Sequence, residues 1–356
     1  MTVTAPPPVV LAGVDAEVLF REARRRRRRR WSAGIVLLVS AVVAVLLVGN
    51  KSVPPRPGPQ PHVGLRRWAP PTGAGRTAPA VFVDGDGKGG VGVYSSTTGS
   101  LLRTLSPQRP GGPDQQAVLS GDHQSVYFAQ PSGTCSGTIL RAPISGVSPP
   151  RTVISVPQTL ALEPAASPTG SDLAWVGVTC GPSGSVATSD LYVTNLNTET
   201  TVTRETVASS NDNGIAWSRD GKLLAVEMGG SVEVVAARQA SLRRAKTMQV
   251  ATGCRLTSPV FLSRPNELAV IRTCLDNVGK IGMSAALVFN IETGKAVSRI
   301  ASAPRGSMFQ GLSVDESGGH ILLGVVSSFT ASAANFQVES GRLVTVSKHS
   351  PTDAEW

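Results

Sequence analysis

The chain has 356 residues, a net charge of +10, 41% hydrophobic residues and only 4% aromatic residues. This hydrophobic content excludes a chain that is disordered throughout, and the length allows one to three domains. Half of the positive excess lies in residues 1–30, which contain eight arginines and three acidic residues. The charge is therefore mainly a local feature and does not by itself indicate a nucleic-acid-binding surface.

Residues 31–49 are predicted to form a single transmembrane helix. Between Ser32 and Gly49 there is no charge, and Ser32 and Ser40 are the only polar side chains. A helix of this length rises about 27 Å, close to the hydrocarbon core of about 30 Å. A backbone in lipid must satisfy its own hydrogen bonds, which favours a helix. A cleaved signal peptide and a buried soluble helix are the alternatives, but Leu47 is bulky where cleavage after Gly49 requires a small residue.

An unbroken run of arginines precedes this segment and is predicted to set its orientation. The run consists of Arg24, Arg25, Arg26, Arg27, Arg28, Arg29 and Arg30. Positive charge beside a membrane span stays cytoplasmic, so residues 1–30 are expected inside as a short Arg-rich tail and residues 50–356 outside. Trp31 is placed as an interfacial anchor. The alternatives are a nucleic-acid or nuclear signal and a short docking helix after Asp15 for a cytoplasmic partner.

Residues 50–79 are predicted to form an extended linker. The segment from Asn50 to Ala80 contains eight prolines, which block helices and sheet ladders and favour polyproline II. At about 3.1 Å per residue, such a linker could hold a domain up to roughly 90 Å from the bilayer. A Pro-rich recognition motif is the alternative.

Residues 80–356 contain a repeated unit of two elements. The first element is a short apolar strand, a turn rich in Ser, Asp and Gly, and a second apolar strand. Its equivalent turn positions are Ser120, Ser167, Ser218, Ser263 and Asp315, at spacings of 47, 51, 45 and 52 residues. The second element is a β-hairpin between alternating strands. Hairpins are predicted over residues 91–105, 191–203, 286–300 and 335–346.

Repeated four-stranded units of this size are typical of a β-propeller, because one unit cannot bury both faces whereas a closed ring of units can. The mean spacing of about 49 residues predicts six blades with an incomplete first one. The missing innermost strand of that blade is expected from Val63–Trp68 or from the C-terminal tail. The predicted fold is therefore all-β, a six-bladed β-propeller of four-stranded blades preceded by one transmembrane helix. A pair of β-sandwiches is the rival architecture.

The turn sequence Ser218-Arg-Asp-Gly-Lys-Leu-Leu-Ala225 and its relatives resemble the WD40-like repeats of TolB-type propellers. The resemblance spans residues 80–348 and is clearest at 218–226 and 167–176. It implies a six-bladed fold and a protein-binding role.

Four cysteines outside the predicted membrane span favour disulfides in an oxidising compartment. Cys135 and Cys180 follow the second strands of consecutive units. Cys254 precedes the first strand of its unit, and Cys274 follows the second strand. The repeat phase therefore places all four on one face of the ring. Of the three possible pairings it favours Cys135–Cys180 and Cys254–Cys274, with four free buried thiols as the alternative.

No catalytic signature stands out in the sequence. The chain has four histidines, at His62, His123, His320 and His349, and no H-x-x-H, C-x-x-C or G-x-S-x-G motif. No metal site, cofactor or hydrolase site is therefore predicted. The segment 84–90 is similar to the start of a calcium loop but has Ser95 where the closing Glu belongs, so it is interpreted as a glycine turn.

A basic stretch is predicted on the fourth blade, mostly on its outer strands, as a solvated surface or a face for an anionic envelope polymer. It consists of Arg238, Arg243, Arg244, Lys246 and Arg255. Nucleic acid is not expected, because no stacking aromatics are interleaved with these residues. We predict a non-enzymatic, single-pass membrane protein whose extracytoplasmic propeller binds a protein or envelope ligand through loops on a rigid scaffold. The alternatives are a propeller enzyme of lactonase or cyclase type and a sensor that signals through the cytoplasmic tail.

Overall fold

The computed structural model describes residues 65–71, 77–85, 90–106, 117–132, 135–181, 186–207, 214–238, 245–276, 281–327, 333–339 and 342–347. These residues belong to one compact unit, Gly64–Trp356. The predicted cytoplasmic tail and transmembrane helix lie outside the described residues. Within the described ranges, no helix is long and apolar enough to span a bilayer.

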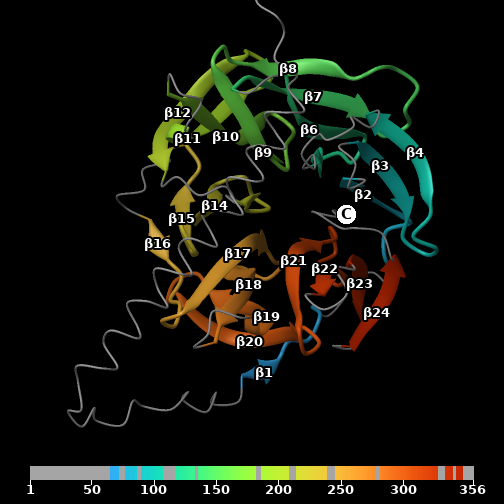
Figure 1. Ribbon diagram of the computed structural model, residues 1–356, viewed down its shortest axis with the longest axis vertical. Coiled ribbons are helices and arrows are strands. Elements are labelled where there is room, and N and C mark those ends of the chain that lie inside the picture. The colour runs from blue at the N-terminus through green and yellow to red at the C-terminus, as the bar shows by residue number, and fades with distance from the viewer. Residues whose placement is uncertain are drawn as a thin grey trace, which may run out of the picture. The chain divides into compact units, whose positions relative to one another are not determined.

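The described strands form six sheets, arranged as blades around a central axis (Figure 1). Blade 1 contains β2 (Val81–Gly85), β3 (Val91–Ser95) and β4 (Leu101–Ser106), and blade 2 contains β5 (Ala117–Leu119), β6 (Ser125–Pro131), β7 (Gly137–Pro143) and β8 (Arg151–Ser155). Blade 3 contains β9 (Thr159–Ala166), β10 (Asp172–Cys180), β11 (Val186–Asn195) and β12 (Thr200–Val207), and blade 4 contains β13 (Ile215–Trp217), β14 (Leu223–Met228), β15 (Ser231–Ala236) and β16 (Lys246–Thr247). Blade 5 contains β17 (Cys254–Phe261), β18 (Glu267–Leu275), β19 (Ile281–Asn290) and β20 (Lys295–Ser302), and blade 6 contains β21 (Ser307–Val314), β22 (Ile321–Ser327), β23 (Ala333–Glu339) and β24 (Arg342–Ser347). The prediction of an all-β, six-bladed propeller is therefore confirmed.

The middle strands are apolar on both faces, because each blade packs between two neighbours. In β18, Leu268 and Val270 join a buried cluster shared with blade 4, whereas Ala269 and Ile271 join one shared with blade 6. All four side chains are fully buried. Burial of a Val, Leu or Ile side chain contributes about 1.5–3 kcal/mol, so the interfaces between blades form the core of this fold.

The repeated turns follow from local hydrogen bonding. In blade 4, the Ser218 hydroxyl accepts a hydrogen bond from the Leu223 N–H at 2.8 Å and donates one to Asp220 at 2.7 Å. Gly221 has a φ of +68°, a left-handed conformation that glycine adopts without steric cost. Gly170 and Gly318 have the same φ at the equivalent turns of blades 3 and 6, three residues after Ser167 and Asp315.

The segment before blade 1 differs from expectation. Arg66–Arg67 forms β1, which pairs in parallel with β20, the outermost strand of blade 5. Trp68 is buried against the core of blades 5 and 6, and its backbone N–H donates to the Arg299 carbonyl at 2.9 Å. The prediction that Val63–Trp68 supplies the missing strand of blade 1 is therefore wrong. The free edge of β20 and the burial of the indole draw the segment, part of the predicted linker, to blade 5 instead.

Blade 1 has three strands among the described residues, and the alternative source of its fourth strand, the tail after residue 347, lies outside them. The ring nevertheless closes, because blades 1 and 6 share a buried cluster of Phe82, Tyr94 and Leu322. The rings of Phe82 and Tyr94 stack with centroids 5.4 Å apart. Among the described residues, apolar packing between the first and last blades therefore closes the ring, and no strand is shared between them.

Candidate binding site in the propeller channel

The innermost strands of blades 2 to 6 surround a cavity of about 230 Å³, which we call the apolar cavity. Its apolar lining includes Ala117, Val118, Ala165, Ile215, Ala216, Trp217, Val260 and Leu312. Trp217 is held in place by a hydrogen bond from its Nε1–H to the Ala165 carbonyl at 2.9 Å, which ties blade 4 to blade 3. The side chains of this wall are mostly apolar, and Glu163 and Ser258 add polar groups to it.

A second cavity of about 210 Å³, the polar cavity, adjoins the first and shares Glu163, Gly214 and Ser258 with it. Its further lining includes Glu227, Arg255, Thr257, Thr273, Met308, Phe309 and Gln310. Arg255 and Thr273 adjoin Cys254 and Cys274, so this cavity lies toward the disulfide-bearing end of the blades. The channel thus changes from apolar to polar along its length and offers carboxylate and guanidinium groups at one end.

The backbone bulges at the same place in three innermost strands. The register between first and second strands shifts between residues 162 and 165 in blade 3, 257 and 260 in blade 5, and 309 and 312 in blade 6. The bulges carry Glu163, Ser258 and Gln310, all of which line the polar cavity. A bulge redirects a side chain that regular pleating would place elsewhere, and here it happens three times around the channel.

Two of these residues have an uncommon backbone conformation. Glu163 has a φ of +52° and Ser258 a φ of +50°, and each precedes a proline, Pro164 or Pro259. A left-handed conformation costs a non-glycine residue about 1–3 kcal/mol, and a following proline normally favours an extended one. The Ser258 hydroxyl also donates to the Gln310 carbonyl at 2.9 Å, which joins blades 5 and 6. This strain marks the bulges as the leading candidate for a functional feature.

At the opposite end, the turns between first and second strands meet across the channel. Arg219 of blade 4 donates hydrogen bonds to the backbone carbonyls of Asp315 and Glu316 in blade 6. His123 of blade 2 lies 3.4 Å from the Glu316 carboxylate. We call these four residues the turn bridge. Because it links alternate blades, the turn bridge crosses the channel at its apolar end.

Asp315 anchors the blade 6 part of the turn bridge. Its carboxylate lies 2.8 Å from the His320 Nδ1 and accepts hydrogen bonds from the Ser317 hydroxyl and the Gly319 N–H. Burial raises the pKa of Asp315, but the hydrogen bonds from His320 and Ser317 outweigh it and leave the pKa below its usual value. For Arg219, burial lowers the pKa, partly offset by the charges of Asp315 and Glu316. The His320 side chain is only 11% exposed, although it lies in a turn, because it pairs with Asp315.

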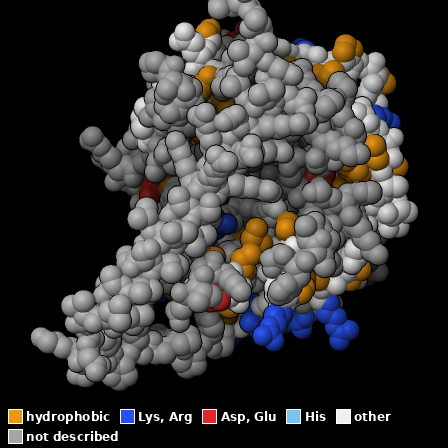
Figure 2. Space-filling model, viewed as in Figure 1, with side chains coloured by type: hydrophobic (Ala, Val, Ile, Leu, Met, Phe, Trp, Pro, Cys, Tyr) orange, Lys and Arg blue, Asp and Glu red, His pale blue; other side chains and the backbone are white. Residues whose placement is uncertain are grey.

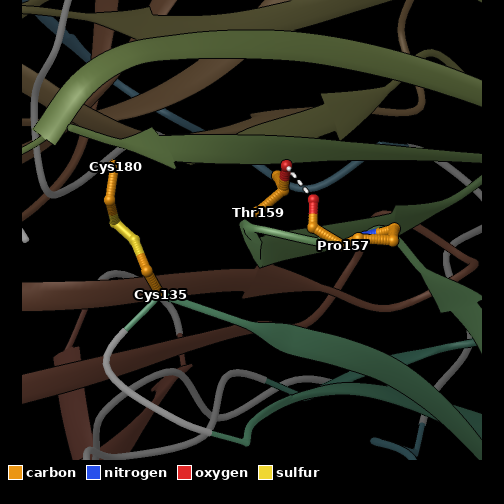
Figure 3. The surroundings of a disulfide bond; sticks show 4 residues. All are labelled: Cys135, Pro157, Thr159 and Cys180. Atoms are coloured by element: carbon orange, nitrogen blue, oxygen red, sulfur yellow. Dashed lines mark hydrogen bonds between the residues drawn. A yellow bond between two sulfur atoms is a disulfide. The ribbon is translucent and has the colours of Figure 1, made fainter. Parts of the chain in front are cut away.

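Both disulfides have the predicted pairing. Cys135–Cys180 joins blades 2 and 3, with Cα atoms 6.0 Å apart, beside Pro157 of the connection between those blades and Thr159, the first residue of β9 (Figure 3). Cys254–Cys274 links directly paired residues of β17 and β18. The four cysteines lie at one end of the blades, as the repeat phase predicts, and no cysteine is free.

The other residues considered from sequence are dispersed. Arg238 and Lys246 lie on the outer part of blade 4, but Arg255 belongs to the innermost strand of blade 5 and lines the polar cavity, so its placement on blade 4 is wrong. The reason is that β16 is short and the next blade begins at Cys254. Part of the predicted glycine turn, residues 86–89, lies outside the described residues. The same holds for His62, Arg243, Arg244 and His349. Among the described residues, no group of three His, Cys, Asp or Glu side chains is arranged to hold a metal ion.

Glu163, Ser258 and Gln310 are not among the candidate residues predicted from the sequence. A signal was available, because Glu-Pro and Ser-Pro pairs stand four to five residues before the turn serines of blades 3 and 5. A proline in an innermost strand indicates an irregularity in the ladder, and two at equivalent positions indicate a repeated bulge.

The geometry defines a six-bladed β-propeller with a channel that is polar at one end. No family model and no curated protein matches the chain. Among solved structures, TolB from Acinetobacter baumannii aligns with a TM-score of 0.57 and 13% identity, over 78% of this chain and 65% of that one. A nidogen/laminin complex aligns with a TM-score of 0.48 and 10% identity, over 77% of this chain and 96% of that one. An oligogalacturonate lyase in complex with manganese aligns with a TM-score of 0.48 and 12% identity, over 73% and 71%.

The chain thus spans 65% of the length of the TolB chain that it resembles. At this identity the likeness establishes the fold, which is that of a TolB-type propeller.

Proposed function

We propose that this protein is a membrane-anchored, extracytoplasmic binding scaffold that captures a segment of a protein or envelope ligand at the polar end of its channel, without catalysis. The observation that carries the proposal is the polar cavity, where bulges in three blades present Glu163, Ser258 and Gln310 beside Arg255. Strained backbone of this kind clusters at ligand-binding positions.

The chemistry of the channel indicates the kind of ligand. Glu163 and Arg255 provide opposite charges in the polar cavity, and Trp217 and Val260 provide apolar surface in the cavity below it. Such a gradient fits a peptide segment that places an apolar side chain deep in the channel and polar groups at its mouth. A protein-binding role also agrees with the TolB-type fold.

Catalysis is less well supported by the same residues. Propeller enzymes of lactonase or cyclase type require several converging Asp, Glu or His side chains. In the part of the polar cavity that the structure describes, the carboxylates are Glu163 and Glu227, and no histidine lines it. We therefore favour binding over an enzymatic role.

The anchor is the predicted transmembrane helix at residues 31–49, with Arg24–Arg30 holding the N-terminus in the cytoplasm. Protease added to spheroplasts that carry the full-length chain should digest residues 50–356 and leave the N-terminal segment protected. Protection of the propeller would contradict the proposed topology. Full function after deletion of residues 1–20 would count against signalling through the tail.

Site-specific crosslinking tests the channel. A photo-reactive amino acid is introduced in place of Gln310 in one variant and in place of Val147, an 85% exposed residue, in a control variant. We expect a defined partner to be captured from position 310 and not from 147, and capture to fall in a Glu163→Gln background. Equal capture from both positions would contradict a channel site.

A further inference from the structure

A row of three side chains crosses blade 2 on the face toward blade 3. Tyr127 of β6 pairs in register with Arg141 of β7, and Arg141 pairs with Arg151 of β8. The Arg141 guanidinium lies over the Tyr127 ring, 5.7 Å from its centroid. Neighbours across strands point to the same face of a sheet, so the phenol and both guanidinium groups lie together.

Two arginines directly opposite each other on a sheet repel each other, which destabilises the sheet unless another interaction offsets the repulsion. Among the described residues, neither Arg141 nor Arg151 forms an ion pair. The nearby carboxylate of Asp122 accepts hydrogen bonds from the Ser120 hydroxyl and the Gln124 N–H and interacts with the charge of Arg141, but it does not line the cavity to which Arg141 and Arg151 belong. Among the residues that line the cavity between blades 2 and 3, the two guanidinium groups face one carboxylate, that of Glu199, so the lining carries a net positive charge.

This row forms one wall of a groove between blades 2 and 3, which lie beside each other in Figure 1. The groove holds a cavity of about 240 Å³, whose opposite wall comes from Thr194, Asn197 and Glu199 of blade 3. A second cavity of about 330 Å³ adjoins it and also contains Thr194 and Glu199. Together the two have the size of small-molecule sites, which run from about 300 to 1,000 Å³.

We propose that this groove is a second binding site, which takes a saccharide that carries one oxyanion, a phosphate or a carboxylate. The oxyanion binds between Arg141 and Arg151, because paired guanidinium groups match its geometry and charge. Glu199, Asn197 and Thr152 on the rim accept and donate hydrogen bonds to sugar hydroxyls. The Glu199 carboxylate offsets one guanidinium charge, so the bound oxyanion neutralises the other.

The site is separate from the channel. Its cavities share no lining residue with the apolar or polar cavity, and they lie between blades 2 and 3, over the second to fourth strands. The inference therefore goes beyond the proposed function, and each can fail without the other. A channel partner would still be captured if the groove bound nothing.

Saturation-transfer NMR on the full-length chain tests the groove, with glucose 6-phosphate, glucuronate and glucose as probes. We expect signals from the anionic sugars and none from glucose, with affinity reduced about tenfold or more in the Arg141→Gln/Arg151→Gln double variant. Arg299→Gln is the matched control, because Arg299 is also exposed on the fourth strand of its blade, without an ion pair among the described residues. It should leave binding unchanged.

Each outcome of this experiment either supports or overturns the proposed site. A signal from only one anionic sugar identifies the oxyanion and supports the site. Absence of both signals, binding of glucose equal to that of the anionic sugars, or binding that survives the double substitution overturns it. If the double variant fails to fold, the single Arg151→Gln variant carries the test, because Arg151 is exposed and its replacement removes one guanidinium without disturbing the core.

Discussion

Arg219 and Asp315 are 96 residues apart in the chain, yet the Arg219 guanidinium donates a hydrogen bond to the Asp315 carbonyl at 3.0 Å. The contact joins blade 4 to blade 6 across the apolar end of the channel. The two turns belong to the same repeated element, so a side chain at one copy of the turn has become a brace for another.

Removing this brace should destabilise the ring. Hydrogen bonds from a charged donor contribute about 1.5–3 kcal/mol, so Arg219→Ala is expected to lower the free energy of unfolding by that amount. The control is Lys222→Ala in the same turn, whose ion pair with Asp220 is exposed and contributes about 0.2–1 kcal/mol. Urea denaturation measures both, and an equal loss in the two variants would contradict the bracing role of Arg219.

Stability should depend on pH through Asp315. Its pKa is lower in the folded protein than the unfolded value of about 3.9, so the unfolded chain takes up the proton first. The stabilising contribution is therefore complete above the unfolded pKa and is lost as pH falls through the folded one. Unfolding free energy measured from pH 6 down to about pH 2 should fall less steeply in Asp315→Asn than in wild type, and identical slopes would count against this assignment.

The two disulfides should differ in their effect. Their sequence separations are 45 and 20 residues, and loop-closure entropy favours the longer loop by about 0.7 kcal/mol. We expect the Cys135→Ser/Cys180→Ser variant to lose slightly more stability than Cys254→Ser/Cys274→Ser, with each loss about 3–4 kcal/mol. Thermal unfolding compares the variants, and non-reducing peptide mapping checks the remaining bond. A crossed pairing in the map would contradict the structure.

Replacing Glu163 at its bulge should affect stability and partner binding differently. Glycine tolerates the left-handed φ of +52°, so Glu163→Gly is expected to leave stability unchanged or raise it by up to about 1 kcal/mol. The same change at the neighbouring strand residue Leu162 should destabilise the protein, since it removes a side chain packed against the core of blades 3 and 4. Denaturation curves give both values, and a large loss in Glu163→Gly would show that the side chain itself holds the strand.

Glu163→Gly should also reduce partner capture from the photo-reactive position 310, because the carboxylate at the polar cavity is lost. A variant that is as stable as wild type and captures as well would contradict a binding role for this residue.

Much of the fold can be predicted from short segments of the sequence. The turns between first and second strands recur because each closes its own hydrogen bonds, as Ser218 and Gly221 show, and a period near 49 residues then predicts the blade number. The pairing of Cys135 with Cys180 follows from the same period. On the face shown in Figure 2, Lys and Arg side chains gather on the rim where β1 and β20 lie in Figure 1, a cluster that the sequence distributes between a linker and a distant strand.

The contacts that cross the repeat were decided only by the tertiary structure. Nothing local directs Arg66–Arg67 to the edge of β20, Arg219 to the turn of blade 6, or Arg141 and Arg151 to a groove with blade 3. The turns and strands follow from the sequence because their hydrogen bonds and alternation are satisfied within a few residues. The braces, the bulges and both candidate sites depend on how the closed ring brings distant copies of the same unit together, because the apolar faces between blades are buried only when the ring is complete.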